Sequence, residues 1–103
     1  MAAKYKKLIS DYCTANGIAV PPGFGRNTAS RYAIIRTHTT PAKLVATTWF
    51  KVADVLYYIQ HQLAPELGDA LSTAIQILDF QTAEVLAYNG SQQLNRIGTF
   101  SLP

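Results

Sequence analysis

The chain has 103 residues, 49% of them hydrophobic and only 15% charged, with a formal net charge of +3. This composition excludes an intrinsically disordered chain, which is rich in charge and poor in aromatic residues, and the length fits one domain over residues 1–103. One cysteine, Cys13, excludes an intrachain disulfide. The lack of a signal-peptide pattern, and of a run near the roughly 18 apolar residues of a membrane span, predicts a cytoplasmic protein without a membrane contact.

The charges are divided unevenly along the chain. Residues 1–51 contain eight lysines and arginines and one aspartate, a net +7, whereas residues 52–103 contain one arginine and five carboxylates, a net −4. If the two halves stay apart in space, the basic half suits an anionic macromolecule, either an acidic protein or a nucleic acid. If the halves interleave, the charges cancel locally and no such face exists.

The first predicted element is an amphipathic helix of about three turns. Its apolar side follows the spacing i, i+3, i+4, i+7 over Tyr5, Leu8, Ile9 and Tyr12. Asn16-Gly17 suits its carboxyl end, because both residues tolerate the left-handed conformation there. Three lysines occupy the first turns, where the helix dipole disfavours cations, so helix stability does not account for them, although solubility is a sufficient reason.

The segment 21–31, PPGFGRNTASR, is a loop by composition and a candidate anion site. Its glycines allow backbone N–H groups to approach an anion, and Phe24 offers a ring for a base. The segment lacks the third glycine of a dinucleotide fingerprint and the Lys-Ser/Thr of a P-loop, so it can equally be a linker whose glycines permit turns. The predicted anion-binding residues are Arg26, Arg31 and Lys43.

The segment 31–37 is predicted to be a strand, and the segment 43–50 has two interpretations. As a strand, 43–50 pairs back on 31–37 through a short loop, and its aromatic and β-branched residues agree with this. As a helix, it begins at Thr40-Pro41 and continues to Leu63. We favour the hairpin, because the strand 31–37 needs a partner.

The segment 52–63 is predicted to be a helix, because its apolar residues fall at i, i+3, i+4, i+7 and i+11. These are Val52, Val55, Leu56, Ile59 and Leu63. We expect Ala64-Pro65 to end the helix, since proline cannot continue it.

Two further strands are predicted at 74–80, apolar on both faces and therefore central, and at 85–88. Asn89-Gly90 is a tight-turn signal, followed by either a short helix through Ile97 or an edge strand. The order α-β-β-α-β-β indicates an α+β fold: a small antiparallel or mixed sheet of about four strands with two main helices on one face.

Aromatic residues give the remaining functional hint. Tyr57 and Tyr58 lie beside the apolar stripe of the second helix, and one face cannot bury the stripe and both tyrosines. The predicted interface residues are Phe50, Tyr57, Tyr58 and His61. A pocket between helix and sheet, lined by Tyr32, Trp49 and Tyr57, is an alternative site for a small ligand.

No catalytic or metal-binding constellation emerges from the sequence. Cys13 borders the apolar side of the first helix, where a free cysteine usually acts as a small hydrophobe, and one cysteine with two distant histidines matches no metal pattern. No cofactor is predicted, and the sequence favours a binding protein over an enzyme. The favoured function is a non-enzymatic interaction module, acting as a homodimer through its aromatic surface and basic half. The alternatives are a nucleic-acid-binding protein and a small-molecule-binding domain or small enzyme.

Overall fold

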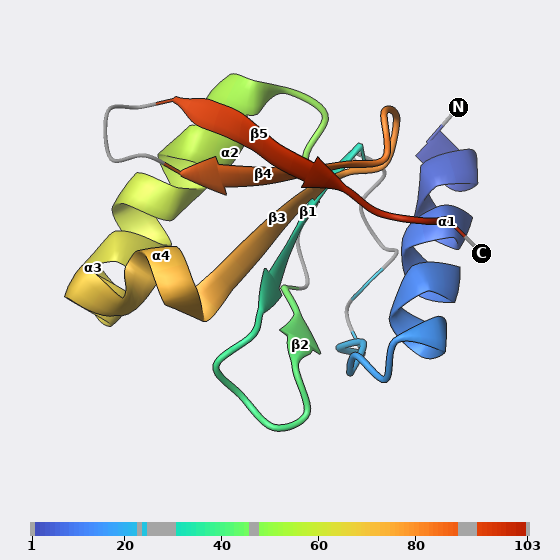
Figure 1. Ribbon diagram of the computed structural model, residues 1–103, viewed down its shortest axis with the longest axis horizontal. Helices are drawn as coiled ribbons and strands as arrows, with labels where there is room; N and C mark the ends of the chain where they lie inside the picture. Colours follow the sequence, from blue (N-terminus) through green and yellow to red (C-terminus); the bar gives the residue numbers. More distant parts are fainter. Residues whose placement is uncertain (1, 23, 25–30, 46–47, 89–92, 103) are drawn as a thin grey trace.

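The computed structural model describes residues 2–22, 24, 31–45, 48–88 and 93–102 (Figure 1). Its strands form one antiparallel five-stranded sheet in the order β2-β1-β3-β4-β5, and the α+β class is the predicted one. The strands are β1 (Tyr32–Arg36), β2 (Lys43–Leu44), β3 (Ile75–Asp79), β4 (Glu84–Tyr88) and β5 (Leu94–Thr99). The helical segments are α1 (Ala2–Ala15), α2 (Val52–Tyr58), η1 (Ile59–Leu63), α3 (Ala64–Leu67), η2 (Gly68–Ala70) and α4 (Leu71–Ala74).

The first helix, α1, ends as predicted in a left-handed glycine. Gly17 has φ +68, and the N–H of Ile18 donates to the carbonyl of Cys13 over 2.9 Å. A weaker bond of 3.5 Å runs from the Gly17 N–H to the Thr14 carbonyl. This pair of bonds is the Schellman pattern, which satisfies carbonyls that the end of a helix leaves free.

The hairpin interpretation is confirmed where residues 43–50 are described, although only Lys43–Leu44 form a strand and 46–47 lie outside the described residues; the single long helix is not formed. β2 pairs antiparallel with β1, placing Leu44 opposite Ile35. Trp49 forms a second antiparallel bridge to Tyr32, with backbone bonds of 2.7 and 3.1 Å in the two directions. The helix begins only at Val52.

Pro65 does not end the helical run, contrary to the sequence-based expectation. η1 is a π-helix, in which the N–H of Ala64 donates to the carbonyl of Ile59, five residues back. This wider turn starts a new hydrogen-bond register, so Pro65 falls in the first turn of α3, where no N–H is required. The run then continues through α3.

Five strands are present where about four were expected, because the segment after β4 is a strand and not a short helix. β5 pairs antiparallel with β4, with an irregularity between Val85 and Leu86. β3 is central in the sheet, as predicted. The predicted turn at Asn89-Gly90 lies outside the described residues.

The two main helices cover opposite faces of the sheet, and the expectation that both pack on one face is wrong. Buried residues of β1 alternate between two core clusters: Tyr32 and Ile34 belong to one, Ala33 and Ile35 to the other. Because both faces of β1 and β3 are apolar, each face needs its own cover. α2 and η1 cover the first cluster with Val55, Ile59 and Leu63, and α1 covers the second (Figure 1).

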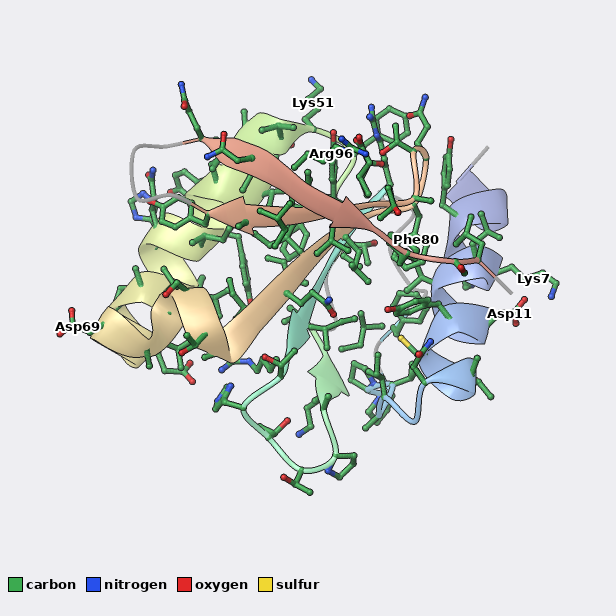
Figure 2. All side chains as sticks on the ribbon, viewed as in Figure 1. Lys7, Asp11, Lys51, Asp69, Phe80 and Arg96 are labelled. Atoms are coloured by element: carbon green, nitrogen blue, oxygen red, sulfur yellow. The ribbon has the colours of Figure 1, made fainter. Side chains whose placement is uncertain are left out.

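The second cluster closes around three aromatic rings. Phe80, which is 2% exposed, packs edge-on against Tyr12 of α1 and Phe100 after β5, with ring centroids 5.7 and 5.1 Å away (Figure 2). Within the described part of the chain, no helix is long and apolar enough to cross a membrane.

Candidate interaction surface

The solvent side of α2 and η1 carries the exposed residues Ala53, Tyr57 and His61, and exposed Phe50 precedes α2 by two residues; we call these four residues the aromatic face. A helix turns by about 100° per residue, which directs Ala53, Tyr57 and His61 opposite to the buried Val55, Ile59 and Leu63. Tyr57 is 65% exposed and Phe50 is 52% exposed, large fractions for side chains of this size. These two rings therefore contribute little to the hydrophobic core.

Tyr57 and His61 form a preassembled pair on this face. Their rings stack with centroids 4.1 Å apart and an interplanar angle of 29°. His61 lies in the π-helical turn, and π turns are rare and often found at functional sites. Because the two rings already hold each other, less side-chain freedom is lost when a partner covers them.

Tyr58, predicted to share the interface, points elsewhere. It is half-buried, and its ring lies 4.8 Å from that of Trp49 at the edge of the first core cluster. Trp49 is 8% exposed and Tyr32 is 5% exposed, so both are core residues. The three residues of the predicted ligand pocket are therefore not brought together: Trp49 and Tyr32 face inward, and Tyr57 faces solvent.

Two exposed charged residues flank the aromatic face along the chain. Lys51 directly precedes α2, and Asp69 lies in η2, beyond the end of α3. Figure 2 shows these two side chains far apart, at opposite ends of the helical run. Neither residue forms an ion pair with any other residue that the structure describes.

The predicted anion-binding residues do not form one site in the described part of the chain. Arg31 is engaged by Asp79, with Nε–Oδ1 and Nη2–Oδ2 distances of 3.1 and 3.0 Å. Lys43 is exposed in β2 at the opposite end of β1, and Arg26 lies outside the described residues.

The basic and acidic halves of the chain interleave where the structure describes them. Arg31 pairs with Asp79, and Arg36 forms a double hydrogen bond to Glu66, at 2.6 and 3.1 Å. Each of these ion pairs therefore joins an arginine of the basic half, residues 1–51, to a carboxylate of the acidic half, residues 52–103. The positive charges of these two arginines are thereby balanced by neighbouring carboxylates. Among the described elements of the first half, α1 then carries the most positive charge.

The described surface is hollowed at two further places, of which the second includes part of the candidate anion loop 21–31. One, of about 280 Å³, lies on the sheet, between α4 and strands β3 to β5. The other, of about 500 Å³, lies between α1 and the residues Val20 and Phe24; its lining residues are Lys6, Lys7, Ser10, Asp11, Val20 and Phe24. The lysine-rich start of α1 and the ring of Phe24 were the available signals in the sequence, but the pattern did not show that a cavity lies between them.

Cys13 and His38 each have a structural environment that accounts for them without a catalytic role. Cys13 is fully buried, and burial raises its pKa to about 11, which keeps the thiol protonated and unreactive. His38 Nδ1 lies 3.1 Å from the carbonyl oxygen of Ala74. No cluster of three or more potential metal ligands occurs among the described residues.

Comparison with known proteins yields no match, whether with family models, with curated protein sequences or with solved structures.

Proposed function

We propose that this protein is a non-enzymatic interaction module that forms a homodimer through the aromatic face. The observation that carries the proposal is the stacked pair of Tyr57 and His61, exposed on the side of α2 and η1 that faces away from the core. Exposed aromatic side chains of this kind are enriched in protein interfaces.

A second copy of the chain is the partner that fits the charges around the face. In a two-fold dimer, residue i of one copy meets residue j of the other, and j meets i. Two antiparallel helical runs bring Lys51 of each copy toward Asp69 of its partner. Both charges lack an ion pair among the described residues, so one symmetric arrangement supplies a partner to each.

The area that a stable dimer interface needs is large enough to extend from the aromatic face to these flanking charges. A stable dimer buries about 800 Å² on each partner. The accessible surface of one chain is 5897 Å², so such an interface takes up roughly one seventh of it. The aromatic face therefore serves as the apolar centre, with Lys51 and Asp69 in the polar rim.

The direct test measures the molar mass by light scattering or sedimentation over a range of protein concentrations. The expected value at high concentration is twice the 11.3 kDa of one chain. Tyr57→Ala is expected to weaken dimerisation by about fivefold or more, because truncation of a central aromatic residue typically costs above about 1 kcal/mol. A monomer at all concentrations would overturn the proposal.

Ile97→Ala is the matched control, because Ile97 is 66% exposed, also large and apolar, but lies on β5. It should leave the dimer intact. If it dissociates the dimer while Tyr57→Ala does not, the interface is the sheet edge and not the aromatic face.

A charge exchange tests the antiparallel arrangement. Lys51→Asp and Asp69→Lys should each weaken the dimer, and the double variant should restore it, because the pair is then reversed. If the loss of dimerisation free energy in the double variant equals the sum of the losses in the two single variants, Lys51 and Asp69 do not meet across the interface.

A further inference from the structure

We propose that the cavity between α1 and the residues Val20 and Phe24 binds a small aromatic anion of the nucleoside monophosphate class. This site shares no residue with the aromatic face and does not depend on dimer formation. Its volume of about 500 Å³ is within the range of about 300–1,000 Å³ typical of small-ligand sites.

One side of the cavity is cationic. Lys6 and Lys7 lie on adjacent positions of α1, and Lys6 has no ion pair among the described residues. Lys7 contacts Asp11 at 2.8 Å, but both side chains are largely in solvent, at 77% and 45% exposure. Such an exposed pair is weak, so the Lys7 ammonium can turn toward a phosphate at little cost.

The opposite side of the cavity is apolar and anchored. Phe24 is half-buried, packs against the second core cluster, and is held by a turn in which its N–H donates to the carbonyl of Pro21 over 3.1 Å. Val20, 40% exposed, extends this apolar side. A half-buried ring fixed at its backbone is a stacking platform for a planar base.

The remaining lining groups favour a sugar between base and phosphate. Ser10 provides a hydroxyl and Asp11 a carboxylate, and these groups accept hydrogen bonds from sugar hydroxyls. The two lysines and Asp11 together leave a net charge of +1 on the lining, which suits a small anion. The site also gives a role to lysines that the dipole of α1 disfavours at its start, where the first turn contains no acidic residue.

The test is calorimetry with adenosine 5′-monophosphate as the probe, with adenosine and inorganic phosphate as separate arms. We expect the monophosphate to bind at least tenfold more tightly than either fragment, and to bind more weakly as salt is raised. No binding at millimolar monophosphate, or equal binding of inorganic phosphate, would overturn the proposal.

Two variants locate the site. Lys6→Gln and Phe24→Leu should each reduce the affinity by about fivefold or more, while Arg96→Gln, an exposed cation on β5 that does not line the cavity, should not. Circular dichroism and the melting temperature verify that each variant is folded. A short single-stranded oligonucleotide forms the last arm: if it binds far more tightly than the monophosphate and Arg96→Gln weakens it as much as Lys6→Gln does, the ligand is a nucleic acid on a diffuse surface and the proposed site is wrong.

Discussion

Arg31 and Asp79 are joined by a two-pronged ion pair that connects the start of β1 to the end of β3. The Asp79 side chain is only 5% exposed, and its Oδ1 also accepts the N–H of Gln81 at 2.9 Å. The Arg31 guanidinium lies 4.9 Å from the centre of the Tyr32 ring. Burial by itself disfavours the charged carboxylate, but the hydrogen bonds from Arg31 and Gln81 lower the pKa of Asp79 below its ordinary value.

Removing Arg31 should therefore destabilise the fold strongly. Arg31→Leu leaves a buried carboxylate without its cation, at an expected cost of about 3 kcal/mol in the free energy of unfolding. Asp79→Asn retains the shape and should cost less, about 1–2 kcal/mol. Urea unfolding at pH 7 measures both. A smaller loss for Arg31→Leu than for Asp79→Asn would contradict this account of the pair.

The same carboxyl makes stability depend on pH. Because the pKa of Asp79 is lower in the folded than in the unfolded chain, its contribution is present above the unfolded pKa of about 3.9 and is lost as the pH falls through the folded pKa. The stability difference between the native protein and Asp79→Asn should shrink below pH 4. Unfolding curves between pH 2 and 7 test this, and a constant difference would exclude Asp79 as the source.

Gly17→Ala should destabilise the carboxyl end of α1. A Cβ at this position would meet no atom within 4 Å, so steric overlap with neighbours is absent. The cost arises from φ +68, which disfavours any residue with a Cβ by about 1 kcal/mol. Thermal unfolding measures the change, and unaltered stability would mean that the cap relaxes to another conformation.

Ala83→Gly should have the opposite effect. Ala83 has φ +58 in the turn between β3 and β4, and its carbonyl accepts the N–H of Phe100 over 3.0 Å. Glycine removes a strain of about 1–2 kcal/mol at the expense of a more flexible unfolded chain. The expected net gain is about 0.5 kcal/mol, measured by urea unfolding beside Gly17→Ala. A loss of stability would show that the turn is not strained.

Cys13 should be inert toward thiol reagents in the folded protein. It is fully buried and its pKa is about 11, so neither access nor ionisation favours attack at pH 8. Its modification by a disulfide reagent should require unfolding and should speed up in urea along with the unfolding transition. Rapid labelling without denaturant would show that α1 detaches from the sheet.

Much of the fold was predictable from residue spacing. The stripe from Val55 to Leu63 and the two-faced pattern of 74–80 identified α2 and β3, because burial repeats with the period of each element. The hairpin at 43–50 also followed from propensity and from the need of β1 for a partner. These predictions depend on local pattern, which the sequence contains directly.

The π-helical turn was not predictable, because a change of hydrogen-bond register leaves no mark in a hydrophobic stripe of five residues. The placement of the helices was not predictable either. Strands with two apolar faces need cover on both sides of the sheet, but the sequence does not show which helix covers which face. Tyr57 was recognised as surplus to the core, whereas Tyr58 was not recognised as partly buried, since adjacent helix positions differ by only about 100°. To predict the cavity beside Phe24, one would need to know how the chain after Gly17 packs against α1.

The alternating burial of β1 has a consequence for the way the protein unfolds. Among the described parts of the chain, β1 and the segment of β3 through Phe80 contribute fully enclosed side chains to both core clusters. The two halves of the interior are therefore coupled through these central strands, which should hold the slowest-exchanging amides and make the domain melt as one cooperative unit. Loosening either strand would separate the protein into two small, individually unstable layers.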